Sequence, residues 1–162
     1  MTVIENVLVG MENKRRSHLL ASFLRLPQFY ANESDLRQKA LALLKIFNLE
    51  DKAETLAKNL PYGQQRRLEI VRALATEPKI LFLDEPAAGM NPQETAELTG
   101  LIRQIKEEFD ITIMLIEHDM SLVMDVTERI YVLEYGRLIA EGTPEEIKTN
   151  KRVIEAYLGG EA

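Results

Sequence analysis

The sequence predicts an α/β domain in which a helical region precedes a region of parallel strands. Before Pro61, apolar residues recur at the three- and four-residue intervals that are typical of amphipathic helices. After Pro61, short runs rich in Ile, Leu and Val alternate with helical segments, which indicates a parallel sheet covered by helices. We therefore divide the chain into a helical region over residues 1–76 and a strand-containing region over residues 77–162.

The helical region has two recognisable starts. Residues Thr2 to Glu5 form a capping-box sequence, because Thr2 and Glu5 can each accept a free backbone N–H of the other. The amphipathic pattern continues through residues 15–24, and Pro27 is expected to interrupt it. A second helix is predicted to begin at residues 32–35. Its apolar face comprises Leu36, Ala40, Leu43, Leu44 and Phe47. Taken alone, this region is also compatible with a small helical bundle.

The second region is predicted to alternate between strands and helices. Three apolar runs are the expected strands, each bounded by turn residues or helix starts. In chain order we predict a helix over Gly63–Thr76, a strand over Ile80–Leu83, a helix after Pro92, a strand over Ile111–Ile116, a short helix after Asp119, a strand over Ile130–Leu133, a hairpin through Tyr135 and Gly136 to Ile139, and a terminal helix opened by Pro144.

Composition excludes several classes of protein. The net charge of −6 argues against a general nucleic-acid binder, which normally carries a basic excess. The chain has no cysteine, so disulfides and thiolate metal sites are excluded. Its longest apolar runs, such as Ile80–Leu83, are too short to cross a bilayer. If the protein acts at a membrane, it does so through a partner.

Two adjacent carboxylates, Asp84 and Glu85, follow the apolar run Ile80–Leu83. The carboxyl edge of a parallel sheet is where ligands bind in such folds. On an extended backbone the two side chains point to opposite faces, so they can take different roles. One can hold Mg²⁺ through water, and the other can position and deprotonate an attacking water. By itself, the pattern also fits a strand end followed by an acidic turn.

Two further motifs are suited to phosphate binding. Gly63 lies at the predicted start of a helix, where free N–H groups and the helix dipole favour an anion, although an ordinary Pro-Gly turn would look the same. His118 follows the strand Ile111–Ile116 and could contact a phosphate oxygen, although a histidine at a strand end can also be a surface or capping residue.

In combination, these motifs resemble those of the ABC ATPase family. The matching segments are a signature motif at Leu60–Gln64, a Walker B strand at Ile80–Glu85, a D-loop at Ala88–Asn91 and the switch histidine His118. The resemblance extends over essentially the whole chain. The segments 62–70 and 85–92, together with the tail from Tyr135 to Gly160, are similar to the LivG-type subunit of branched-chain amino acid importers.

The resemblance implies a fold, a reaction and partners. The fold is the C-terminal part of an ABC ATPase domain of the P-loop NTPase class, with a helical subdomain and an incomplete parallel sheet. The cofactors are ATP and Mg²⁺. The partners are a second ATP-binding subunit, identical or different, and membrane permease subunits, with no nucleic acid, at the inner face of the cell membrane on the cytoplasmic side. The implied catalytic residues are Glu85 and His118, the Mg²⁺ residue acting through water is Asp84, and the nucleotide-binding residues are Tyr62, Gly63, Gln64 and Asn91.

The chain also departs from the family pattern. It contains no Gly-x-x-x-x-Gly-Lys-Ser/Thr loop, which normally cradles the phosphates, and the Q-loop glutamine belongs to the same absent portion. Pro61 stands where the family has a serine, Tyr62 where it has the first glycine, and Asn91 where it has an aspartate. We therefore expect an N-terminally truncated chain that is inactive alone. The alternatives are an ATPase of another transporter, such as the lipopolysaccharide-export type, and a non-catalytic fragment that docks on a partner or blocks its dimer.

The resemblance has a consequence for the sheet. It implies that a strand outside this chain lies between Ile111–Ile116 and Ile130–Leu133, so these two strands would have no backbone partner between them. Unpaired strand edges invite pairing with another strand. We therefore expect either that these two strands meet directly or that the chain self-associates.

Overall fold

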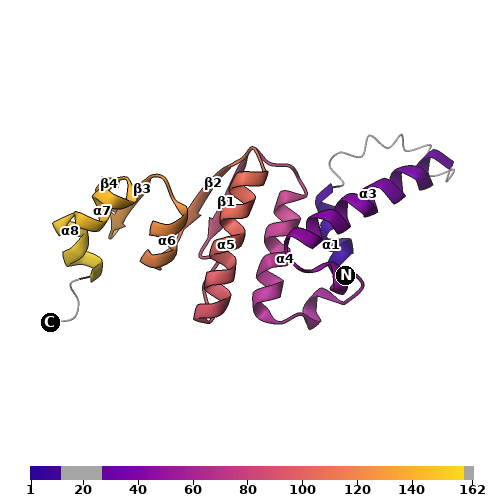
Figure 1. Cartoon of the computed structure of the whole chain (residues 1–162), viewed down its shortest axis with the longest axis horizontal. Coiled ribbons are helices and arrows are strands. Elements are labelled where there is room, and N and C mark those ends of the chain that lie inside the picture. The colour runs from indigo at the N-terminus through magenta and orange to yellow at the C-terminus, as the bar shows by residue number, and fades with distance from the viewer. Residues whose placement is uncertain (12–26, 159–162) are drawn as a thin grey trace.

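The computed structural model describes residues 1–11 and 27–158 (Figure 1). The helical pattern predicted over residues 15–24 therefore lies outside the described residues. The described chain combines helices with a parallel and an antiparallel strand pair, which confirms the predicted α/β class.

The first helix, α1 (Val3–Met11), begins as the sequence predicts. The backbone N–H of Thr2 donates to Glu5 Oε2 at 2.7 Å, and the N–H of Glu5 donates to Thr2 Oγ1 at 3.3 Å. Both bonds of the capping box are thus formed, because the motif needs only residues within one helical turn.

Helix α3 (Pro27–Ile46) starts earlier than the sequence analysis placed it. We expected a start at residues 32–35, and this prediction is wrong. Proline is well tolerated in the first helical turn, where its missing N–H would have no partner in any case, so Pro27 can stand at the start of α3. The interruption predicted at Pro27 for the helical pattern over residues 15–24 concerns residues outside the described part of the chain. The predicted apolar face is confirmed. Ala40, Leu44 and Phe47 are fully buried, and Leu36 and Leu43 pack against the same core.

Two 3₁₀ turns, Glu50–Lys52 and Ala57–Asn59, lead to helix α4 (Tyr62–Leu74). Helix α4 begins one residue before the predicted range Gly63–Thr76, ends two residues before its end, and packs against α1 and α3. Together with β1 and α5 these helices surround one continuous hydrophobic cluster that runs from Val3 to Ile105. This cluster includes residues on both sides of position 76, and the division of the chain at that point stays a prediction.

Strands β1 (Ile80–Asp84) and β2 (Thr112–Ile116) form a two-stranded parallel sheet. In its register Ile80 pairs with Thr112 and Asp84 pairs with Ile116, so the carboxyl ends of the two strands lie side by side. Helix α5 (Pro92–Glu108) connects them, and helix α6 (Met120–Val126) follows β2 and packs against α5. On β1, Leu81 and Leu83 are buried in the main cluster, whereas the alternate residues are exposed.

Strands β3 (Ile130–Glu134) and β4 (Arg137–Gly142) form a separate antiparallel hairpin, as the sequence predicts. Its turn residues, Tyr135 and Gly136, have positive φ angles of 46° and 74°, which suits a two-residue hairpin turn. Helix α7 (Pro144–Thr149), helix α8 (Lys151–Val153) and a π-helical turn (Ile154–Leu158) end the described chain. A second hydrophobic cluster lies here, comprising Val123, Ile130, Val132, Ile147 and Val153.

Strands β2 and β3 do not pair with each other, so the expectation that they meet directly is wrong. The hairpin gives β3 a local partner, and the second cluster buries Ile130 and Val132 of this strand without help from β2. Both arrangements use residues close in sequence, whereas a parallel β2–β3 pair would need a crossover connection that returns onto the first sheet. The alternative expectation, self-association, stays a prediction.

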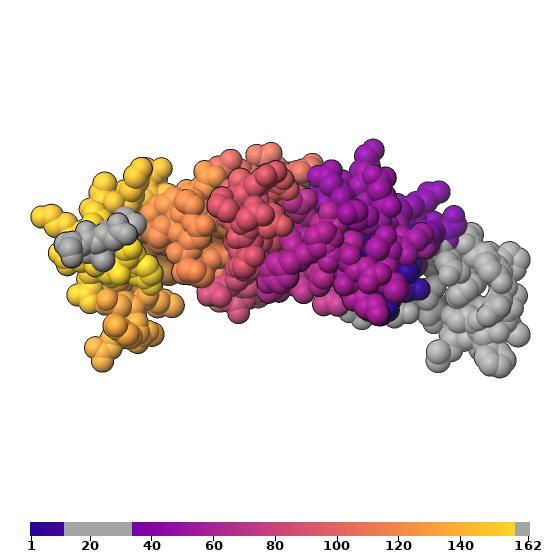
Figure 2. Space-filling view, turned by 90° about the horizontal axis from the view of Figure 1, so that it is seen from below, coloured from indigo at the N-terminus to yellow at the C-terminus, as the bar shows by residue number. Residues whose placement is uncertain are grey.

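The elements follow one another along the long axis of the molecule. Figure 2 shows the colours in sequence order from the helical end, in purple, to the C-terminal end, in yellow. The β1–β2 sheet lies near the middle, with α4 toward one end and α6 toward the other (Figure 1). This arrangement places the predicted signature helix and the carboxyl ends of β1 and β2 in the same part of the molecule.

Candidate active site at the carboxyl ends of β1 and β2

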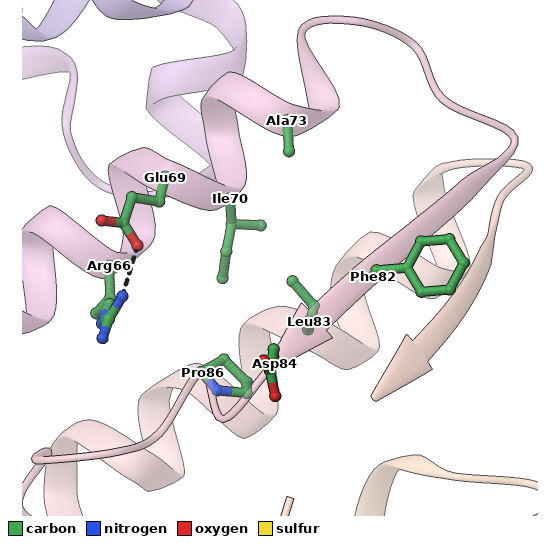
Figure 3. Close-up of a pocket in the computed structure, with 8 residues that line it drawn as sticks. All are labelled: Arg66, Glu69, Ile70, Ala73, Phe82, Leu83, Asp84 and Pro86. Carbon is green, nitrogen blue, oxygen red and sulfur yellow. Dashed lines mark hydrogen bonds and ion pairs between the residues drawn. The ribbon is translucent and has the colours of Figure 1, made fainter. Parts of the chain in front are cut away.

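Asp84 is the last residue of β1 and lies on the exposed face of that strand with Ile80 and Phe82. Its carboxylate borders a hollow of about 140 Å³ between β1 and α4 (Figure 3). On the α4 side this hollow is lined by Arg66, and Figure 3 shows the ion pair between Arg66 and Glu69 facing the strand across it. Asp84 is therefore open to a ligand.

Glu85 does not continue the extended strand. Its N–H still donates to the carbonyl of Ile116 at 2.9 Å, but its φ angle of 43° is in the left-handed region. The expectation that Asp84 and Glu85 point to opposite faces of an extended backbone is therefore wrong at Glu85. The physical reason is the turn that follows, in which the N–H of Ala88 donates to the carbonyl of Glu85 at 3.1 Å.

The structure brings Glu85 and His118 together. His118 Nδ1 lies 3.4 Å from Glu85 Oε1, and their side chains are 71% and 53% exposed. The two residues follow β1 and β2 respectively, and parallel pairing places the ends of these strands at one sheet edge. Asp119 comes next and caps α6, where the hydroxyl of Ser121 donates to its carboxylate and lowers the pKa of Asp119. The edge thus presents a carboxylate and an imidazole side by side, both accessible to solvent.

Glu117 is the residue of this edge that sequence reasoning did not select. Its side chain is only 1% exposed, and its two oxygens accept backbone N–H groups from Ala87 at 2.9 Å and His118 at 3.1 Å. The signal available in the sequence was an acidic residue directly after an apolar strand. That signal does not reveal burial, which depends on the turn after Glu85.

The predicted signature residues lie at the start of α4 and contact the predicted D-loop of the same chain. Pro61 is the N-cap and provides no side-chain hydrogen bond. The hydroxyl of Tyr62 accepts a hydrogen bond from Arg66 Nε at 3.0 Å, and its ring lies against Gly89. Gly63 is buried and faces the carboxylate of Glu94. Gln64 Oε1 accepts a hydrogen bond from Lys52 Nζ at 2.9 Å.

Asn91 is the N-cap of α5. Its side-chain oxygen accepts the N–H of Glu94 at 3.0 Å, and Glu94 Oε2 accepts the N–H of Asn91 at 3.0 Å. In this arrangement the Asn91 oxygen is already engaged in a capping box. Any nucleotide contact of Asn91 would use its amide N–H₂ group or a rearranged cap.

The described residues contain no cluster of three or more His, Asp or Glu side chains that could hold a metal. At the sheet edge the carboxylates of both Asp84 and Glu85 are exposed, and that of Glu85 faces His118. Mg²⁺ is commonly held by one or two carboxylates, with substrate phosphates and water completing its shell, so a single Asp84 fits that mode of binding.

Comparisons with known proteins identify the class to which this fold and site belong. The family model described as "ABC transporter" matches residues 1–88, and the chain belongs to this family. Within it, a second model, described as "Branched-chain amino acid ATP-binding cassette transporter", matches residues 137–162. A solved structure of a nucleotide-free ATP-binding cassette from an ABC transporter superposes with a TM-score of 0.76 at 34% identity, covering 97% of this chain and 62% of that one.

Curated relatives carry the branched-chain amino acid description. The high-affinity branched-chain amino acid transport ATP-binding protein LivG of Salmonella typhimurium is 49% identical over 98% of this chain. The corresponding protein BraF of Pseudomonas aeruginosa is 46% identical over the same share. In each case the chain spans 62% of the relative's length. Within the part of the chain that the structure describes, no helix is long and apolar enough to cross a membrane.

Proposed function

We propose that this chain supplies the signature, Walker B, D-loop and switch-histidine part of an ATP-hydrolysing motor subunit for a branched-chain amino acid importer. The observation that carries the proposal is the 3.4 Å approach of Glu85 and His118 at the carboxyl edge of a parallel strand pair, in a member of the ABC transporter family. The LivG and BraF relatives support the amino acid substrate and favour it over a lipopolysaccharide-export role.

In this proposal each residue of the edge has a separate task. Glu85 orients the attacking water and accepts its proton, and His118 contacts the terminal phosphate of ATP. Asp84 holds Mg²⁺ through water, and the ion supplies charge neutralisation on the phosphates. Catalysis of phosphoryl transfer depends mainly on such positioning and charge stabilisation, which agrees with a site made of two accessible carboxylates and an imidazole.

The start of α4 would serve the nucleotide held by a second ATP-binding subunit. Gly63, Gln64 and Tyr62 lie in its first turn, where free N–H groups and the helix dipole favour an anion. Asn91 lies nearby, since Glu94 of its capping box faces Gly63. Permease subunits would hold such a pair at the inner face of the membrane.

The sequence lacks the phosphate-loop motif, so a direct test supplies that part from a relative. We suggest a chimera in which the N-terminal portion of Salmonella LivG that has no counterpart here precedes this chain. The chain alone should show no measurable ATPase activity and only weak ATP affinity, whereas the chimera should hydrolyse ATP. A chimera that folds and does not bind ATP would argue for the non-catalytic alternative.

Glu85→Gln in the chimera provides the sharper prediction. Loss of the general base should reduce ATP turnover by about 10²–10⁴-fold, while ATP binding remains because the binding contacts are unchanged. The matched control is Glu107→Gln, which neutralises an exposed glutamate of α5. Equal turnover in Glu85→Gln and the control would show that Glu85 is not the base. Leucine uptake in cells that lack LivG, restored by the chimera and not by Glu85→Gln, would support the proposed substrate.

A further inference from the structure

The environment of Glu117 differs from that of the other acidic residues at the sheet edge. Its side chain is 1% exposed, whereas that of Glu85 is 53% exposed. Burying a carboxylate is unfavourable unless hydrogen bonds compensate, and N–H groups that donate to an ionised oxygen make strong bonds. Glu117 has such a donor on each oxygen: Ala87 N–H on Oε1 and His118 N–H on Oε2. Its burial is thus matched by contacts to two backbone segments.

One of these segments is the turn after β1. The N–H of Glu85 bonds to Ile116, and the N–H of Ala88 bonds back to Glu85. Pro86 has no N–H, and the N–H of Ala87 is taken by Glu117. Glu117 therefore attaches the middle of this turn to the end of β2. Such an attachment matters here because Glu85 has a φ angle of 43°, a conformation that a non-glycine residue keeps only where its surroundings enforce it.

The other segment is the backbone of His118. Glu117 Oε2 accepts the His118 N–H at 3.1 Å, and the imidazole Nδ1 of His118 faces Glu85 Oε1 at 3.4 Å. One buried side chain therefore contacts both the turn that follows Glu85 and the backbone of His118. We propose that Glu117 is a positioning residue that fixes the turn carrying Glu85 and keeps its carboxylate opposite His118. The consequence for catalysis rests on the proposed function, but the positioning itself is a property of this chain.

The test uses NMR spectroscopy and amide hydrogen exchange on the whole chain without nucleotide. In Glu117→Ala, the Ala87 N–H loses its acceptor and should exchange at least about tenfold faster, whereas amides in the core of α4, such as Val71, should keep their rates. The control Glu107→Ala removes an exposed glutamate and should change neither rate. Unchanged exchange at Ala87 in a folded Glu117→Ala variant would overturn the proposal.

Glu117→Gln provides a second test should the alanine variant fail to fold. Glutamine preserves the side-chain volume, but its amide has a single oxygen, so either the Ala87 or the His118 N–H must lose its present acceptor. We expect faster exchange at one of these two amides. Retention of wild-type exchange at both would contradict the proposed attachment.

A double-mutant cycle distinguishes positioning of the catalytic pair from general support of the fold. Glu85→Gln should change the ring chemical shifts of His118, because the two side chains face each other. If Glu117 positions Glu85, this change should fall by at least about half when Glu117→Gln is also present. An equal change in both backgrounds would overturn the positioning role. Because none of these measurements involves ATP, they can succeed even if the ATPase test fails.

Discussion

A Cβ atom added at two buried glycines, Gly10 and Gly63, would contact neighbours that differ in their ability to move. A Cβ on Gly10 of α1 would lie 2.5 Å from the carbonyl oxygen of Arg72 and 2.9 Å from Ala75 Cβ, both part of the packed α4 segment. A Cβ on Gly63 would lie 2.8 Å from Glu94 Oε1, the end of a flexible side chain. The first contact can be relieved only by separating helices, whereas the second requires one carboxylate to turn.

These contacts predict different effects of the same substitution. Gly10→Ala should reduce the free energy of unfolding by about 1–3 kcal/mol, as is typical for overpacking of a core contact. Gly63→Ala should change it by less than about 1 kcal/mol, because the helix propensity of alanine offsets part of the disturbed Asn91–Glu94 cap. Urea unfolding of both variants measures the difference. Equal stability of the two variants would show that α1 and α4 are less tightly packed at Gly10 than the structure implies.

At the scale of single residues, the sequence predicted which side chains lie close together at the site better than it predicted their conformation and burial. Glu85 and His118 each follow an apolar strand, so their proximity could be expected from parallel pairing. The left-handed φ angle of Glu85 could not, because it belongs to the turn closed by the Ala88–Glu85 hydrogen bond, and the burial of Glu117 could not, because it involves a hydrogen bond from Ala87. Thirty positions separate these two residues, so no local pattern records their contact.

At the scale of secondary-structure elements, predictions based on contacts within one helical turn were the most successful. The Thr2–Glu5 capping box forms as its sequence indicates. The start of α3 was misplaced because proline is compatible both with the end of one helix and with the first turn of the next. The separation of β2 from β3 could not be read from the sequence either, because apolar strands carry no mark that identifies their neighbours.

The cap of α6 gives an element-scale prediction with a defined pH dependence. Asp119 accepts the N–H groups of Ser121 and Leu122, and the Ser121 hydroxyl is the main cause of its lowered pKa. A carboxyl whose pKa is lower in the folded state stabilises the fold above its unfolded pKa, near 3.8, and this contribution is lost as the pH falls through the folded pKa.

Asp119→Asn should therefore distinguish the stabilisation that comes from the hydrogen bonds of the cap from the stabilisation that comes from its charge. Asparagine is a comparable N-cap, so the variant keeps the backbone bonds and loses the pH-dependent part of the stabilisation. We expect the stability difference between wild type and Asp119→Asn to shrink as the pH is lowered from about 6 toward 3. Asp119→Ala should cost about 0.5–2 kcal/mol at neutral pH. Urea unfolding at a series of pH values measures both effects, and a pH-independent difference for Asp119→Asn would contradict the assignment.

At the scale of the whole molecule, the order of the elements along the long axis explains why so much of the fold could be predicted. Neighbours in sequence are mostly neighbours in space (Figures 1 and 2). The helices and the β3–β4 hairpin depend largely on nearby residues, and such structures follow from local patterns. The β1–β2 sheet is the main exception, and its parallel pairing was expected because α5 provides the crossover between the strands.

The same arrangement leaves one face of the β1–β2 sheet open. Ile80 and Phe82 of β1 are 51% and 66% exposed, and Met114 and Ile116 of β2 are 52% and 53% exposed. These four residues share a face, because paired residues of parallel strands point the same way. Contiguous exposed apolar side chains of this kind favour association, as do strand edges without a partner.

We therefore predict that the purified chain self-associates through this face as its concentration rises through the micromolar range. Fully burying a Phe or Met side chain contributes about 1.5–3 kcal/mol, so Phe82→Ser combined with Met114→Ser should weaken association by at least about 3 kcal/mol, or about two orders of magnitude in Kd. The control is Val9→Ser on α1, which removes a comparably exposed apolar side chain, 51% exposed, far from the sheet. Light scattering and sedimentation velocity measure the effect. Two outcomes would each contradict association through this face: a wild-type chain that stays monomeric over that range, or a control that weakens association as strongly as the double variant.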